Sequence, residues 1–180
     1  MTQLAKHKGG TARQRANTIQ IIVARPHTPT GLHRLLIVED APDDVKMIIA
    51  ALSPVVSKEH IAIATSGEEA LDYLFGRGAH GGRNTDFQPD LITLDLNLPR
   101  LSGFEVLRQI RSNPATRLLP VIIVSASAEQ RDIRLASALG ANSYVRKPLD
   151  YVRLSETLAQ MARYWLELNI APPIGHALDK

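Results

Sequence analysis

The sequence contains no cysteine, few aromatic residues and no long apolar run, and each absence excludes a class of protein. Without cysteine among its 180 residues, the chain cannot form disulfides, thiolate metal sites or a cysteine nucleophile. Its apolar stretches are shorter than a bilayer span, and its amino terminus lacks the continuous apolar segment of a secretory signal. We therefore expect a cytoplasmic protein without membrane contact, folded around one hydrophobic core.

Acidic residues are also absent from the start of the chain, where the positive charge is concentrated. Six of the 21 basic residues lie within positions 1–34, ahead of the first acid, Glu39, and the other 15 face 18 acids, which leaves a net charge of −3. We interpret residues 1–33 as a flexible basic extension, residues 34–169 as one domain and residues 170–180 as a short tail. Nucleic-acid binding by the extension is a less favoured alternative, because aromatics are few and no known binding motif is present.

From Leu35 onward, short apolar runs alternate with helical patterns. This alternation favours parallel strands joined by crossover helices, and hence an α/β fold of five strand–helix repeats. The expected strands lie near 35–39, 60–64, 90–95, 120–125 and 143–146. The expected helices cover about 42–53, 67–75, 103–112, 128–139 and 150–168.

Two helices carry further local signals. Ser66 and Glu69 predict a capping box at the start of the helix 67–75, with Glu69 reaching back to the backbone of Ser66. The last helix has an apolar stripe that predicts its buried face. The residues expected on that face are Val152, Leu158, Met161, Trp165 and Leu168.

Carboxylates follow two of the expected strands. Asp95 comes directly after the apolar run 91–94, and Glu39 and Asp40 come after the run 35–38. A buried ionised carboxylate is costly unless it is paired, hydrogen-bonded or bound to a metal, and the carboxyl ends of parallel strands meet at one sheet edge. Three such groups would raise one another's pKa unless a cation lies among them, and oxygen ligands favour a hard ion such as Mg²⁺.

Two later strands add a hydroxyl and a cation to the same edge. Ser125 ends the run 121–124, and Lys147 follows the strand 143–146. Taken singly, each residue has a plain structural explanation: the Glu39-Asp40 pair could cap the following helix, Ser125 could be an ordinary strand-end hydroxyl, and Lys147 could be solvated. Taken together, they indicate a site.

In this order and spacing, these residues resemble the receiver domain of two-component response regulators over about positions 34–168. The matching features are the acidic pair, Asp95 within a D-x-N-x-P motif, Gly103 eight residues after Asp95, a hydroxyl 30 residues after it and Lys147-Pro148 beginning 52 residues after it. The resemblance implies a flavodoxin-like (βα)5 doubly wound parallel sheet with strand order 2-1-3-4-5.

The resemblance also implies the chemistry of the site. Asp95 would accept a phosphoryl group from a phosphohistidine of a histidine kinase, forming an aspartyl phosphate. Mg²⁺ would be held by the side chains of Asp40 and Asp95 and the backbone carbonyl of Asn97, with Glu39 acting through water. Lys147 would neutralise phosphoryl oxygens, and the peptide bond after it would be cis.

Switching is implied for Ser125 and Tyr144. The hydroxyl of Ser125 would donate to a phosphoryl oxygen, and its movement would let Tyr144 turn inward. Phosphorylation would thereby change the face formed by the helix 128–139, the strand 143–146 and the helix 150–168. A homodimer is expected to form through this face.

The partner and the alternatives follow from the rest of the chain. Only 32 residues follow Pro148, so we expect no DNA-binding or enzymatic output domain. Asp43-Asp44, the long loop 76–89 and the run 164–166 resemble the single-domain regulators that partner bacterial phytochrome-type histidine kinases.

Aspartate-based phosphohydrolases usually carry a second aspartate two residues after the nucleophile, where this chain has Asn97, so an enzyme is not expected. A pseudo-receiver that only binds partners is a further alternative.

Overall fold

The computed structural model describes residues 34–148 and 150–172. The predicted extension, residues 1–33, and positions 173–180 of the predicted tail lie outside the described residues. The interpretation of both segments stays a prediction.

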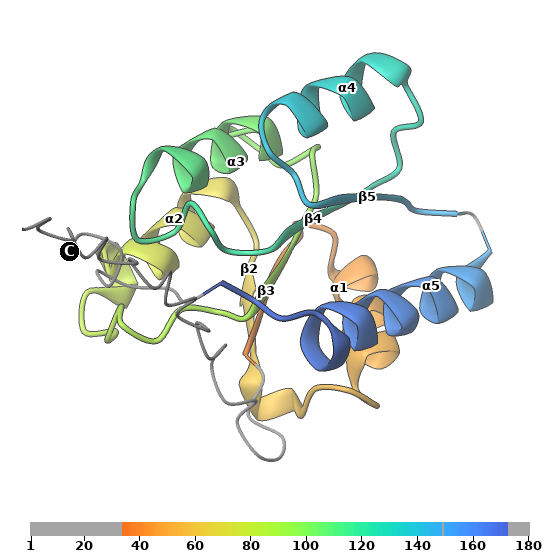
Figure 1. The fold of residues 1–180 in the computed structure, drawn as a ribbon, viewed down its shortest axis with the longest axis horizontal. Helices are drawn as coiled ribbons and strands as arrows, with labels where there is room; N and C mark the ends of the chain where they lie inside the picture. The colour runs from red at the N-terminus through yellow and green to blue at the C-terminus, as the bar shows by residue number, and fades with distance from the viewer. Residues whose placement is uncertain (1–33, 149, 173–180) are drawn as a thin grey trace, which may run out of the picture.

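Five parallel strands form one sheet in the order β2-β1-β3-β4-β5 (Figure 1). The strands are β1 (Leu35–Val38), β2 (Ile61–Ala64), β3 (Leu91–Leu94), β4 (Val121–Ser125) and β5 (Ser143–Arg146). In the register of the sheet, Leu35 of β1 lies opposite Ile61 on one side and Leu91 on the other. The predicted flavodoxin-like doubly wound sheet is thereby confirmed.

Helices cover both faces of this sheet. They are α1 (Pro42–Leu52), α2 (Gly67–Phe75), α3 (Gly103–Ser112), α4 (Gln130–Ala138) and α5 (Tyr151–Arg163), with a π-helical turn, η3 (Tyr164–Leu168), extending α5. Two short 3₁₀ helices, η1 (Lys58–His60) and η2 (Gly78–His80), lie in the connections. In Figure 1, α1 and α5 lie together on one side of the sheet, and α2, α3 and α4 lie on the other.

The central strands are buried along their whole length because helices lie on both sides of them. In β1, Leu36 and Val38 face the core shared with α2 and α3, whereas Leu35 and Ile37 face the core shared with α1 and α5. A parallel sheet covered on both faces needs apolar residues at consecutive positions, which explains the continuous apolar runs of the sequence. The same burial holds the carboxyl ends of β1, β3 and β4 rigidly side by side.

The predicted capping box of α2 is only half correct. The Ser66 hydroxyl accepts from the backbone N–H of Glu69 at 3.2 Å, as expected. The Glu69 carboxylate, however, accepts from the backbone N–H and the hydroxyl of Thr65 at 2.7 and 2.9 Å, because Thr65 offers two donors to one oxygen. A complete capping box, not predicted from the sequence, joins Ser102 and Glu105 at the start of α3.

The predicted buried face of the last helix was also partly wrong. Val152 and Leu168 are 63% and 71% exposed. Val152 precedes the buried Leu158 by six residues, a rotation of about 240° on a helix of 3.6 residues per turn, so it lies away from the sheet. The buried residues are Leu154, Leu158, Met161, Ala162 and Leu166.

Candidate functional site

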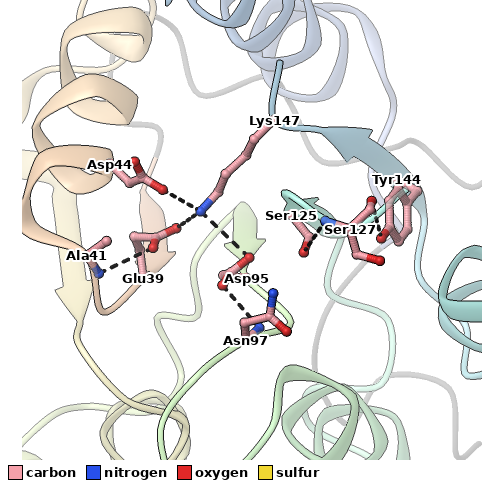
Figure 2. Close-up of polar contacts among 9 residues, drawn as sticks. All are labelled: Glu39, Ala41, Asp44, Asp95, Asn97, Ser125, Ser127, Tyr144 and Lys147. Atoms are coloured by element: carbon pink, nitrogen blue, oxygen red, sulfur yellow. Dashed lines mark hydrogen bonds and ion pairs between the residues drawn. The ribbon is translucent and has the colours of Figure 1, made fainter. Parts of the chain in front are cut away.

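Asp95 lies directly after β3 and is 5% exposed. Its backbone N–H donates to the carbonyl of Val38 at 3.0 Å, which anchors it beside the end of β1. Its Oδ2 accepts from the backbone N–H of Asn97 at 3.1 Å (Figure 2). Its Oδ1 is buried without a hydrogen-bond partner among the described residues. A buried charged acceptor without a partner is costly, so this oxygen indicates a binding function rather than a packing role.

The acidic pair at the end of β1 lies next to Asp95. Glu39 is 2% exposed, whereas Asp40 is exposed. One carboxylate oxygen from each of Glu39, Asp40 and Asp95 lies within 4.8 Å of the other two. This all-oxygen donor set, together with the Oδ1 of Asp95 that no described residue hydrogen-bonds, fits a hard divalent cation.

Lys147 reaches into this acidic cluster from the end of β5. Its backbone N–H donates to the carbonyl of Ser125 at 2.8 Å, which fixes its position beside β4. Its Nζ lies 2.6 Å from Glu39 Oε2, 2.7 Å from Asp44 Oδ2 and 3.6 Å from Asp95 Oδ1 (Figure 2). The ammonium therefore donates to Glu39 and Asp44 but stands outside hydrogen-bond distance of Asp95.

Asp44 was not predicted to be a site residue. It lies in the first turn of α1. The signal in the sequence was its position four residues after Asp40, but the neighbouring Asp43 is equally acidic and its side chain is 94% exposed. Only the direction of α1 distinguishes the two.

The expected cis peptide bond after Lys147 is absent, since the described residues contain no cis peptide bond. The trans form is the lower-energy isomer of a bond before proline.

Burial and charge shift the pKa values of two groups in the cluster. Burial raises the pKa of Glu39, and the ion pair with Lys147 offsets only part of that rise while the charge of Asp95 adds to it. Burial alone would lower the pKa of Lys147, but its hydrogen bonds to Asp44 and Glu39 and the charge of Asp95 outweigh burial and raise it. Lys147 is therefore fully charged at neutral pH.

Ser125 and Tyr144 are joined through the loop that follows β4. Ser125 is completely buried, and its hydroxyl accepts from the backbone N–H of Ser127 at 3.4 Å. The Tyr144 hydroxyl donates to the carbonyl of Ser127 at 3.0 Å, and the Ser127 hydroxyl donates to Asp132 Oδ2, in the first turn of α4, at 2.6 Å. Sequence reasoning missed Ser127 and Asp132, because no spacing signal marks either residue.

Gly103 brings the start of α3 against the end of β3. A Cβ atom at this position would lie 2.1 Å from the carbonyl oxygen of Asp95 and 2.8 Å from the Cα of Leu96. The backbone N–H of Gly103 donates to the carbonyl of Leu96 at 3.0 Å. Glycine is thus required by the close approach of two backbones next to Asp95.

The sequence model of the response regulator receiver domain matches residues 35–159. This chain belongs to the response regulator receiver domain family. Within the family, the receiver is 35% identical over 138 residues to the probable methanogenesis regulatory protein FilR2 of Methanothrix harundinacea. That match covers 77% of this chain and 86% of FilR2.

Two solved structures of similar proteins bear on the site. The receiver is similar to the phosphorylated cyanobacterial phytochrome response regulator RcpA, with a TM-score of 0.72, 32% identity and coverage of 78% of this chain and 99% of RcpA. It is similar to the Mn²⁺-bound form of response regulator Rcp1 from Synechocystis, with a TM-score of 0.70, 29% identity and coverage of 78% and 99%. The resemblance to phytochrome response regulators is thereby confirmed, and the acidic cluster of Glu39, Asp40 and Asp95 fits a divalent metal such as the Mn²⁺ bound in the Rcp1 structure. None of the described helices is long and apolar enough to cross a membrane.

Proposed function

We propose that Asp95 accepts a phosphoryl group from a phosphohistidine of a histidine kinase and that the receiver signals through the resulting change of its surface. A carboxylate oxygen of Asp95 forms a bond to phosphorus as the phosphorus–nitrogen bond of phosphohistidine breaks, and the imidazole leaves with the electron pair. The observation that carries this proposal is the buried Oδ1 of Asp95, which has no hydrogen-bond partner among the described residues and lies 3.6 Å from the Lys147 ammonium.

Positioning and charge neutralisation would supply most of the catalysis. The residues proposed to hold Mg²⁺ are Asp40 and Asp95 through their side chains, Asn97 through its backbone carbonyl and Glu39 through water. When bound, the ion would neutralise part of the phosphoryl charge. Lys147 would neutralise further phosphoryl charge from the side of β5, where its ammonium lies 3.6 Å from Asp95 Oδ1.

The proposed switch runs from the site to α4, β5 and α5. The Ser125 hydroxyl would turn to donate to a phosphoryl oxygen, which would move the loop that includes Ser127. Because Ser127 bonds both Tyr144 and Asp132, its displacement would shift β5 and the start of α4 together.

We propose that the surface made by α4, β5 and α5 also forms a homodimer. Exposed apolar side chains occur on both helices, as expected for the centre of an interface. They are Ile133, Leu135, Tyr151 and Val152. The similarity to RcpA supports a phytochrome-type histidine kinase as the partner. A phosphohydrolase activity is disfavoured, because the amide of Asn97 cannot act as a general acid.

The proposal is tested by measuring the intact mass of the protein after incubation with Mg²⁺ and acetyl phosphate. The native chain is expected to gain one phosphoryl group, and Asp95→Asn is expected to gain none. Asp86→Asn, an exposed change in the loop before β3, serves as the control and is expected to behave like the native chain. If neither acetyl phosphate nor a phosphorylated histidine kinase labels the native chain, the phosphoacceptor proposal is wrong.

A further inference from the structure

We propose that Asp44 is a positioning residue that holds Lys147 away from Asp95. A phosphoryl group on Asp95 can then bind the Lys147 ammonium only if the hydrogen bond between Lys147 and Asp44 is broken. This inference rests on the proposed phosphoacceptor function. Its basis is the unequal distribution of contacts around Lys147 Nζ, which lies 2.7 Å from Asp44 Oδ2 and 3.6 Å from Asp95 Oδ1.

A lysine that served Asp95 alone would donate to it directly. Here two of the three ammonium protons are used by Glu39 and Asp44, at distances typical of charge-assisted hydrogen bonds. Asp95 Oδ1 is left without a hydrogen bond among the described residues. The Asp44 carboxylate, in α1, therefore competes with Asp95 for the ammonium of Lys147.

The contact between Lys147 and Asp44 differs from an ordinary surface ion pair. The side chains of Lys147 and Asp44 are 12% and 30% exposed, whereas those of the pair formed by Lys46 and Asp43 are 76% and 94% exposed. Solvent screens the exposed pair of Lys46 and Asp43 almost completely, but it screens the pair of Lys147 and Asp44 much less. Removing the charge of Asp44 should therefore alter the electrostatic environment of Lys147, whereas removing the charge of Asp43 should not.

Phosphorylation would reverse the balance of these contacts. The phosphoryl oxygens would lie on the Asp95 side of the ammonium, and a donor approaching the site is itself anionic. Asp44 opposes both steps, because it adds a negative charge and retains the lysine. The side chain of Asp44 thus slows phosphoryl transfer, while Glu39, the other hydrogen-bond acceptor of the ammonium, keeps Lys147 in the site.

The first test compares Asp44→Asn with Asp43→Asn, a variant of the same chemistry in the same helical turn. The phosphorylation rate is measured over a range of acetyl phosphate concentrations at saturating Mg²⁺, so that the maximal rate and the half-saturating concentration are separated. We expect Asp44→Asn to raise the maximal rate by about three- to tenfold, the effect of removing one partly screened charge, and Asp43→Asn to match the native chain. Equal rates in the two variants, or a change confined to the half-saturating concentration, would overturn the inference.

A second test does not depend on phosphorylation. The lysine ammonium groups are observed by ¹H–¹⁵N NMR without metal, where a hydrogen-bonded Lys147 ammonium exchanges slowly with water. We expect its signal to shift and to exchange faster in Asp44→Asn but not in Asp43→Asn, and an unchanged signal in Asp44→Asn would refute the contact. If the native chain accepts no phosphoryl group while this signal behaves as expected, the proposed function fails and the contact stands.

Discussion

The hydroxyl group of Tyr144 donates a hydrogen bond of 3.0 Å to the backbone carbonyl of Ser127. This bond ties β5 to the loop that leads from the end of β4 into α4. Burial raises the pKa of Tyr144, so the hydroxyl stays protonated and able to donate well above neutral pH. The candidate site and the surface of α4 and β5 therefore share one structural element.

Tyr144→Phe removes this hydrogen bond without changing the shape of the ring. We expect the free energy of unfolding to fall by about 1 kcal/mol, the usual net contribution of one hydrogen bond, in urea denaturation followed by circular dichroism. Tyr164→Phe is the control, because Tyr164 is 52% exposed on the π-helical turn, and it is expected to change stability little. Equal stability of the two variants would mean that the Tyr144 bond contributes nothing to the native state.

Gly103→Ala places a methyl group 2.1 Å from the carbonyl oxygen of Asp95. The start of α3 has to move away from β3, and we expect a loss of about 1–3 kcal/mol of stability, as for other overpacked sites. Gly82→Ala is the matched control, because a Cβ there has no heavy atom within 4 Å. Thermal unfolding compares the two, and an unchanged melting temperature in Gly103→Ala would contradict the close approach.

Lys147→Met leaves the buried Glu39 carboxylate without its cation. The pKa of Glu39, already raised from 4.5 by burial, is expected to rise further. A carboxyl group with a raised pKa contributes stability that is fully present below its unfolded-state pKa and is lost as the pH rises through its folded-state pKa. We therefore expect the variant to be least destabilised near pH 4 and to lose about 2 kcal/mol at neutral pH.

This pH dependence is measured by urea denaturation in the presence of EDTA. Lys46→Met, which removes an exposed lysine paired with Asp43, is the control and is expected to show no such trend. A constant difference between Lys147→Met and the native chain from pH 4 to 7 would show that Glu39 does not depend on Lys147. In the native chain, the stability that Lys147 itself contributes is fully present below pH 10.5, its ordinary pKa, and is lost as the pH rises through its raised pKa in the folded state.

Asp40→Asn replaces one negatively charged carboxylate of the cluster proposed to hold Mg²⁺ by a neutral amide. An ion that binds only the folded state stabilises it, by about 2.7 kcal/mol at a concentration one hundred times its dissociation constant. We expect added Mg²⁺ to stabilise the native chain and Asp43→Asn alike, and to have little effect on Asp40→Asn. A full Mg²⁺ response in Asp40→Asn would exclude Asp40 as a ligand.

Ile133→Glu places a charge on the exposed face of α4, where Ile133 is 40% exposed. If α4, β5 and α5 form the proposed dimer, we expect the dimer to weaken about tenfold or more in analytical ultracentrifugation, because a charge would be buried in an apolar contact. Phe87→Glu, in the loop before β3, is the control and is expected to leave association unchanged. A monomeric native chain, with or without acetyl phosphate, would refute the dimer.

Much of the fold and of the candidate site could be predicted because each signal lies within a short stretch of chain. The apolar runs of β1, β3 and β4 end where the acids and the hydroxyl begin, and parallel strands necessarily bring those ends to one edge. Asp95, Glu39 and Lys147 were therefore expected together, and the structure brings them together. Gly103 was noticed from its spacing, but the reason for it, the contact with the backbone of Asp95, appears only in three dimensions.

The sequence by itself determined the α/β repeat and the residues collected at the sheet edge, since covalent adjacency and periodicity suffice for these, whereas the strand order was expected from the family resemblance. The tertiary structure decided which of two adjacent acids pairs with Lys147, because the direction of α1 turns Asp44 inward and Asp43 outward. It likewise decided that Ser127 bonds Tyr144, 17 residues away, and that Val152 faces solvent. Such contacts depend on how whole elements pack against one another, and no local pattern encodes that geometry.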